Sequence, residues 1–171
     1  DCIRQMIDYI SGKISTVVLL VNPTRDYVHK IIKTLQPSFL QFHGDETPKF
    51  CNQFDYPYIK AIRVSPDLNI ERAIEHFNPK GGFLFDTWHP KKYGGTGGTF
   101  DWDVLPNELK APKILAGGLT STNVGQAIKI ARPDVVDVSG GVESLKGIKD
   151  ERLIANFVDS VGSADMKINK K

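Results

Sequence analysis

Asp86 directly follows an apolar run, an uncommon place for an acidic side chain. The apolar residues Phe83-Leu-Phe85 precede it within Gly82-Phe-Leu-Phe-Asp-Thr87, a segment typical of a buried strand. A carboxyl group there is costly to remove from water, and burial raises its pKa. A carboxyl group that keeps its proton near neutral pH can act as a general acid. Asp86 is therefore the candidate catalytic acid, with a helix cap or an ion-pair partner in a solvated loop as the alternative.

Two glycine pairs end two later apolar runs. Gly117 and Gly118 lie in Leu115-Ala-Gly-Gly-Leu119, and Gly140 and Gly141 lie in Val138-Ser-Gly-Gly-Val142. Glycine at a strand end lets backbone N–H groups approach an anion, and a helix N-terminus beyond it adds a favourable dipole. The two pairs predict a phosphate site, although the same glycines could serve only to permit tight turns.

Three other side chains at or near strand ends could take part. Asp137 could orient a substrate hydroxyl group or only accept hydrogen bonds from backbone donors. His43 could reach the same site or be a structural histidine, and Arg63 could bind an anion or pair with an Asp or Glu. Four glycines at positions 94, 95, 97 and 98 also suggest a loop that closes over a ligand.

The elements that must position these residues alternate regularly between strand and helix. Short apolar runs predict strands, and most of the segments between them carry helix-start signals or the apolar spacing of a helix. The predicted strands cover residues 16–22, 39–44, 58–64, 82–87, 113–118 and 135–140. This order predicts an α/β fold with a parallel sheet, and it leaves both a closed barrel and a doubly wound sheet open.

Composition narrows the function classes. The 171 residues suit one domain, and 22 Lys and Arg against 20 Asp and Glu give a net charge of +2. Because a lysine-bearing C-terminal tail supplies that excess, we expect no nucleic-acid partner, and no apolar run is long enough for a membrane span. Two cysteines favour reduced thiols in a cytoplasmic protein. We expect one domain over residues 1–162 and a polar, frayed tail over 163–171.

The sequence lacks the motifs of several common classes of enzyme and metal site. The four histidines show no metal-ligand spacing, either with one another or with cysteine. The dinucleotide-binding, Walker and serine-hydrolase motifs are also missing from the sequence. Metal binding, hydride transfer, ATP use and serine hydrolysis therefore lack support.

Taken together, these segments resemble the phosphoribosylanthranilate isomerase family over nearly the whole chain. The resemblance lies in Gln41-Phe-His-Gly-Asp-Glu46, in Tyr93-Gly-Gly-Thr-Gly-Gly-Thr-Phe-Asp-Trp102 after Asp86, and in the two glycine-rich runs. It implies an isomerase of the intramolecular oxidoreductase type, which converts N-(5′-phosphoribosyl)anthranilate by an Amadori rearrangement in tryptophan biosynthesis, without a metal or a cofactor. Asp86 would protonate the furanose ring oxygen, the glycine pairs would bind the phosphate, and Asp137 would lie beside the sugar. The protein would be a monomer or a homodimer.

The resemblance also implies a (β/α)8 TIM barrel, of which this chain would hold strands three to eight while the first two strands are missing. In the family a cysteine on the first strand removes the C2′ proton, and Cys2 does not match it. We therefore expect that cysteine within about 45 residues upstream of Asp1.

The alternative is a non-catalytic barrel remnant that binds a phosphorylated sugar. Two neighbouring barrel enzymes, indole-glycerol-phosphate synthase and a pentose-phosphate epimerase, lack support because their catalytic residues are not found in the sequence.

Overall fold

A six-stranded parallel sheet forms the centre of the molecule. The computed structural model describes residues 2–10, 12–90 and 98–168. The strands lie side by side in chain order, each hydrogen-bonded to the next. They are β1 (Val17–Leu20), β2 (Phe39–Phe42), β3 (Tyr58–Val64), β4 (Gly82–Thr87), β5 (Lys113–Leu115) and β6 (Val135–Val136). All six predicted apolar runs therefore contain a strand.

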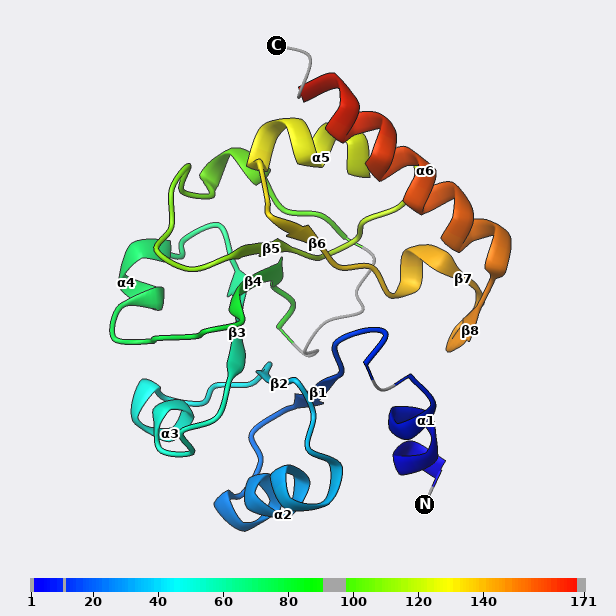
Figure 1. Ribbon diagram of the computed structural model, residues 1–171. Coiled ribbons are helices and arrows are strands. Elements are labelled where there is room, and N and C mark those ends of the chain that lie inside the picture. Colours follow the sequence, from blue (N-terminus) through cyan, green and yellow to red (C-terminus); the bar gives the residue numbers. More distant parts are fainter. Residues whose placement is uncertain (1, 11, 91–97, 169–171) are drawn as a thin grey trace.

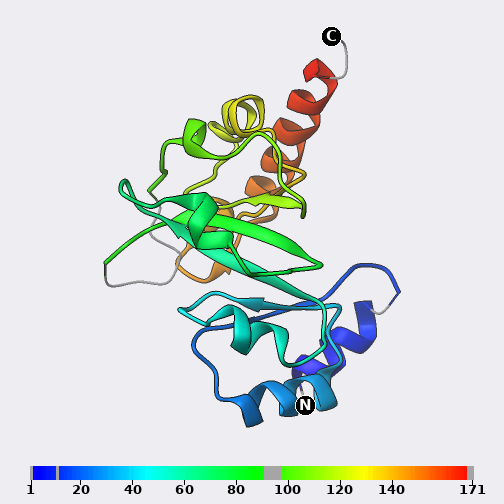
Figure 2. The same ribbon diagram turned by 90° about the vertical axis from the view of Figure 1, so that its left-hand side faces the viewer.

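Helices surround the outside of this curved sheet, as Figure 1 shows. They are α1 (Cys2–Ile10), α2 (Arg25–Leu35), α3 (Pro48–Asn52), α4 (Ile70–Ile74), α5 (Val124–Ala131) and α6 (Glu151–Ile168), with short 3-10 helices η1 (Trp102–Val104) and η2 (Gly140–Val142). Figure 2 places α1, α2 and α3 on one side of the strands and α5 and α6 on the other.

The expectation of an eight-stranded barrel with its first two strands missing is wrong. The described residues form a half-barrel whose parallel sheet consists of all six strands and ends at β1 and at β6. The number eight came from the resemblance, whereas the apolar runs themselves indicated six strands. A small antiparallel pair, β7 (Glu143–Leu145) with β8 (Ile148–Lys149), was not predicted.

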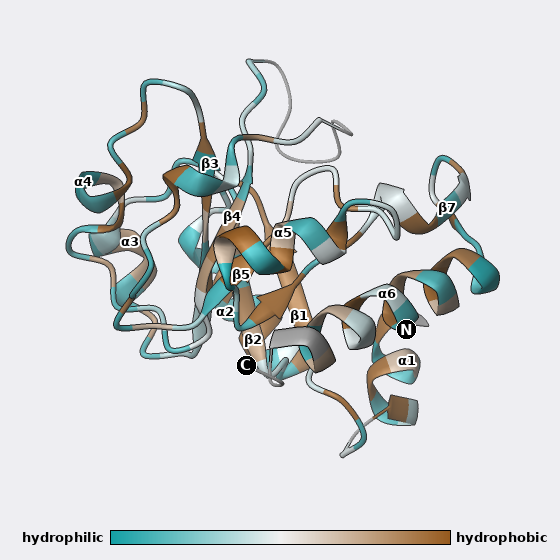
Figure 3. Ribbon diagram, turned by 90° about the horizontal axis from the view of Figure 1, so that it is seen from above, coloured by the Kyte–Doolittle hydropathy of each residue, from teal (hydrophilic) through white to brown (hydrophobic). Residues whose placement is uncertain are grey.

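The two faces of the sheet bury different sets of side chains. Inside the curve, Ile59, Ala61, Leu84, Ile114 and Ala116 form a small apolar cluster. Alternate residues of the same strands face outward and pack under the helices, because side chains in a strand point to opposite faces. Figure 3 shows the result, with hydrophobic strands and helices that carry both polar and apolar residues. The inner face is therefore where the strand ends can bring polar groups together.

Side-chain caps define where the first helices begin. Thr24 caps α2 by accepting a hydrogen bond from the N–H of Tyr27, and Thr47 caps α3 in the same way. Helix α5 begins differently, because the side chain of Asn123 at its N-cap makes no cap hydrogen bond to the helix. Instead its side chain accepts from the N–H of Thr120 and donates to the carbonyl of Gly118, so it fixes the loop after β5.

Helix α6 extends further than the sequence suggested. It runs to Ile168, so the expected boundary between residues 1–162 and a frayed tail over 163–171 falls inside the helix. Ala164 is 3% exposed and belongs to the main apolar cluster, which explains why the last turns are ordered. None of the helices in the described part of the chain is long and apolar enough to cross a membrane.

Candidate active site

Asp86 lies near the C-terminal end of β4, where its carboxylate contacts His43, the residue that follows β2. The carboxylate is 5% exposed, and its Oδ2 lies 3.1 Å from Nε2 of His43. The other oxygen, Oδ1, accepts a hydrogen bond of 2.8 Å from the N–H of Thr87. On its far side, His43 Nδ1 lies 3.0 Å from the amide nitrogen of Gln41. Two strands thus hold one buried carboxylate through both of its oxygens.

The strand register brings these groups together. The backbone N–H of His43 donates to the carbonyl of Leu20 at the end of β1, which continues the parallel pairing by one residue. Gln41 and His43 are two residues apart, so both point into the curve of the sheet. Asp86 is paired in register with Arg63 on β3. The guanidinium of Arg63 donates to Asp45, so the structure places the predicted anion-binding arginine in an ion pair at the rim.

Asp137 follows β6 and feels the charge of Asp86. Loss of water around this carboxyl group raises its pKa, and the negative charge of Asp86 raises it further. His43 and Lys149 act in the opposite direction. The two predicted acidic residues therefore belong to one electrostatic unit.

The two glycine pairs also meet one another at this end of the sheet. Gly117 has a φ of 83°, and a Cβ there would lie 2.4 Å from the Thr87 hydroxyl oxygen and 3.1 Å from Oδ1 of Asp86. A Cβ on Gly141 would lie 1.9 Å from the carbonyl oxygen of Leu119. Only glycine allows these close approaches. The space beside Gly140 is open, with nothing within 4 Å of an added Cβ.

A buried ion pair behind β2 was missed by the sequence analysis. Lys60 donates to Glu46 Oε2 at 2.8 Å and to the carbonyl of Gly44 at 2.8 Å, and both charged side chains are almost fully buried. Glu46 in turn accepts from the N–H groups of Asn22 and Gly44. These bonds join the ends of β1, β2 and β3 and so fix the backbone next to His43. The available signal was a lysine inside an otherwise apolar strand.

The expected closing loop and the two cysteines lie away from this cluster or outside the described residues. Glycines 94, 95 and 97 of the expected closing loop lie outside the described residues, as does the side chain of Cys2. Gly98 is described, and its carbonyl accepts a hydrogen bond from the Thr87 hydroxyl. Cys51 is a free thiol in α3, buried behind β2, and desolvation raises its pKa to about 12.

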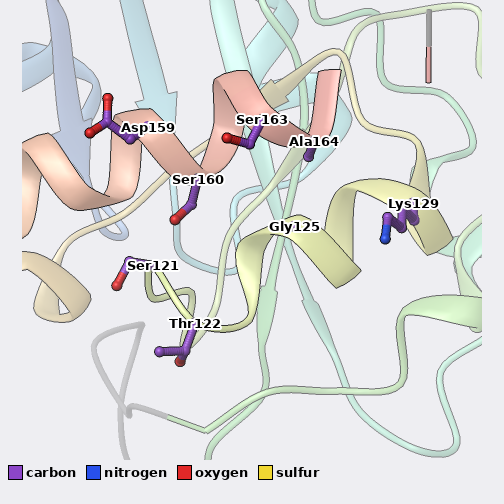
Figure 4. Close-up of a pocket in the computed structure, with 8 residues that line it drawn as sticks. All are labelled: Ser121, Thr122, Gly125, Lys129, Asp159, Ser160, Ser163 and Ala164. Carbon is purple, nitrogen blue, oxygen red and sulfur yellow. The ribbon is translucent and has the colours of Figure 1, made fainter. Parts of the chain in front are cut away.

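A separate pocket lies between α5 and α6, on the outer side of the sheet (Figure 4). Small polar residues and Lys129 line about 320 Å³ there, and no residue of the Asp86 cluster is among them. Within the described part of the chain, no group of three or more His, Cys, Asp or Glu side chains is arranged to hold a metal ion.

The fold and the site define a class: an α/β protein with a buried carboxylate–histidine pair and a glycine-lined corner at the carboxyl ends of parallel strands. The family comparison is specific. Residues 4–160 match the model of N-(5′-phosphoribosyl)anthranilate (PRA) isomerase, and the chain belongs to that family.

Individual relatives agree with this assignment. The chain is 47% identical over 145 residues to N-(5′-phosphoribosyl)anthranilate isomerase of Neisseria meningitidis serogroup C, which covers 85% of this chain and 70% of the relative. The solved phosphoribosyl anthranilate isomerase of Thermotoga maritima superposes with a TM-score of 0.81 at 31% identity, over 94% of this chain and 79% of that one. A further solved isomerase, in complex with reduced 1-(o-carboxyphenylamino)-1-deoxyribulose 5-phosphate, has a TM-score of 0.75 at 27% identity, over 94% and 78% of the two chains.

Proposed function

We propose that this protein isomerises N-(5′-phosphoribosyl)anthranilate by an Amadori rearrangement, as an intramolecular oxidoreductase in tryptophan biosynthesis, with Asp86 as the general acid. The observation that carries the proposal is the buried Asp86 carboxylate, held by His43 and Thr87 beside Gly117. The similar Neisseria meningitidis protein is an N-(5′-phosphoribosyl)anthranilate isomerase, and a similar solved isomerase binds reduced 1-(o-carboxyphenylamino)-1-deoxyribulose 5-phosphate.

The first step assigned to Asp86 is the opening of the sugar ring. Its carboxyl proton passes to the furanose ring oxygen while the bond between that oxygen and C1′ breaks. The lone pair of the anthranilate nitrogen forms the C1′=N bond, which gives a protonated Schiff base. The carboxylate left on Asp86 accepts the N–H of Thr87 at one oxygen and faces His43 Nε2 at the other. Hydrogen bonds to a developing charge lower the barrier of such a step.

The second step removes the C2′ proton, and the electrons move through C1′ to the nitrogen to give an enolamine. Ketonisation then adds a proton to C1′ and removes one from the C2′ hydroxyl group, so the overall reaction is an isomerisation. Cys51 is unsuited to the proton abstraction, because it is buried in α3 and its pKa is raised to about 12. We therefore assign Asp86 the acid step only.

The phosphate end of the substrate is assigned to the two glycine corners. Gly117 and Gly118 follow β5 and have φ angles of 83° and 61°. Gly140 and Gly141 begin η2, and Gly141 packs against the backbone of Leu119. Two adjoining backbone turns without side chains let N–H groups approach an anion. Asp137, which follows β6 and interacts electrostatically with Asp86, is assigned to the sugar hydroxyl groups.

Turnover of the substrate by wild type and by two Asp86 variants tests the proposal. Asp86→Asn keeps the shape of the side chain but cannot donate an acidic proton, so we expect kcat to fall on the order of 10²–10⁴-fold. Asp86→Glu keeps the acid and should retain more activity. Loss of anthranilate fluorescence measures the rate. An Asp86→Asn variant as fast as wild type would remove Asp86 from this role.

One observation favours a second function, a non-catalytic module that binds a phosphorylated sugar. The one described cysteine thiol, that of Cys51, does not face the Asp86 cluster. Under this alternative the wild-type chain binds ribose 5-phosphate but does not convert the anthranilate substrate. The same assay, run beside a binding measurement by calorimetry, separates the two functions.

A further inference from the structure

The ring of His43 lies between two side chains, one at each nitrogen. Nδ1 is 3.0 Å from Nε2 of Gln41, and Nε2 is 3.1 Å from Oδ2 of Asp86. The three residues are 9%, 6% and 5% exposed, respectively, so water has little access to either bond. Hydrogen bonds in such surroundings are strong, and their direction matters.

The chemistry of the amide group sets that direction. The amide nitrogen of Gln41 carries two hydrogens and accepts none, so it donates to Nδ1 of His43. Nδ1 is then unprotonated, and a neutral ring carries its proton on Nε2. Nε2 therefore donates to Oδ2 of Asp86.

We propose that Gln41 is a positioning residue: it fixes the Nε2–H tautomer of His43 and so directs the acidic proton of Asp86 to the substrate. This inference rests on the proposed function of Asp86 as the general acid. With the opposite tautomer, Nε2 would be a free acceptor, and the O–H of Asp86 would point to it instead. With the Nε2–H tautomer, Oδ2 accepts from His43, and the proton on the carboxyl group is left to face the sugar.

Other charged groups near the cluster do not impose this choice. Asp137 interacts with Asp86 from the end of β6, and Lys149 acts on Asp137 from β8. Arg63 stands next to Asp86 on β3 and donates to Asp45. Gln41→Met leaves this set of charges as it is, so an effect of that substitution reports on the bond to His43.

Nitrogen NMR of the histidine ring tests the inference directly. In wild type at neutral pH we expect His43 Nδ1 to resonate as an unprotonated nitrogen and Nε2 as a protonated one. In Gln41→Glu the new carboxylate accepts a hydrogen bond, so Nδ1 should become protonated. Gln41→Met, which has a similar shape and no donor, should lose the preference. A wild-type ring with its proton on Nδ1, or unchanged spectra in both variants, would overturn the proposal.

Kinetics supply a second readout that a purely structural role would not give. Gln41 touches His43 rather than the substrate, so Gln41→Glu should lower kcat on the order of 10-fold or more. It should change KM by less than about twofold. The matched control is Gln5→Glu, which makes the same change on the exposed face of α1 and should leave kcat unchanged. A rise in KM with kcat unchanged in Gln41→Glu would count against a positioning role.

The two proposals can fail separately. If Asp86→Asn retains full activity while His43 shows the expected tautomer, the assignment of Asp86 as the acid is wrong, and Gln41 then fixes the His43 ring without directing an acidic proton. If Asp86→Asn is slow but the His43 proton lies on Nδ1, the role of Gln41 is wrong and the general acid stands.

Discussion

Asp86 and Asp137 illustrate how position, rather than residue type, gives a carboxyl group its chemistry. Asp86 has a hydrogen-bond donor at each oxygen, whereas the pKa of Asp137 is raised mainly by desolvation and then by Asp86. Two carboxyl groups with different surroundings can divide acid and binding roles between them.

The raised pKa of Asp137 makes stability depend on pH. Because its folded-state pKa lies above the unfolded value of 3.8, the folded state binds the proton more tightly. This contribution is full below that value and is lost as pH rises through the folded-state pKa. Asp137→Asn should therefore become more stable relative to wild type between pH 4 and pH 7, measured by urea unfolding. Asp159→Asn, on the exposed side of α6, is the control, and a difference that does not grow with pH would contradict the prediction.

Single residues were predictable only where their local sequence was unusual. Asp86 stood out because it ends an apolar strand, and the glycine pairs stood out because both follow strands. The bond between His43 and Asp86 joins residues 43 apart in the chain, and no local pattern reports such a contact. Lys60 and Glu46 were missed for the same reason, since each finds its partner only when β2 and β3 are paired.

Between elements, the contact of η2 with the loop after β5 depends on Gly141. A methyl group there would lie 1.9 Å from the Leu119 carbonyl oxygen, so Gly141→Ala must displace one of two backbone segments. We expect a loss of about 1–3 kcal/mol in unfolding free energy and weaker binding of ribose 5-phosphate. Gly140→Ala is the matched variant for stability, because an added Cβ meets open space, and it should unfold within about 0.5 kcal/mol of wild type. Equal losses in the two variants would contradict this account.

The buried pair of Lys60 and Glu46 joins three strand ends, and its loss should be costly. Lys60→Met leaves a buried carboxylate without its cation, which we expect to lower the unfolding free energy by about 3–5 kcal/mol. The double variant Lys60→Met/Glu46→Leu removes both charges and should recover part of that loss. Breaking the exposed pair of Arg4 and Asp8 with Asp8→Asn should cost less than about 1 kcal/mol. Urea unfolding of wild type and of the three variants measures these differences in unfolding free energy.

The positions of the parallel strands were predictable from the sequence, whereas the end of helix α6 and the short antiparallel pair β7–β8 were not. Apolar runs predicted all six parallel strands, but β6 has only two residues because the chain leaves the sheet after Asp137 and enters η2 at Gly140. Helix α6 continues past Gly162, since burial of Ala164 against the main cluster outweighs a polar sequence. Tertiary packing of this kind is absent from local periodicity.

At the scale of the whole molecule, the number of strands was the principal error. Counting apolar runs gave six strands, and the family resemblance implied eight, which the half-barrel contradicts. The open sheet leaves the inner sides of its edge strands exposed, with Leu19 on β1 at 55% and Val135 on β6 at 50%. The centre of the sheet, in contrast, is fully buried, which makes a thiol beneath it a useful probe of global unfolding.

Cys51 is that thiol: it is 1% exposed and its pKa is raised to about 12. In a Cys2→Ser chain we expect a thiol reagent to label Cys51 only when the molecule unfolds. Labelling in native buffer should be slower than in strong urea by a factor of about 10³ or more. Mass spectrometry follows the reaction. Rapid labelling of the native protein would show that α3 opens independently of the sheet.

The central claim is that the proton donor and the phosphate corner form one site, and residue-resolved NMR with ribose 5-phosphate tests it most directly. We predict saturable shifts of the amide resonances of Gly118, Gly141 and Thr87, with much smaller shifts when ribose without phosphate is added. Shifts confined to the outer pocket around Lys129, with those three amides unmoved, would contradict the account.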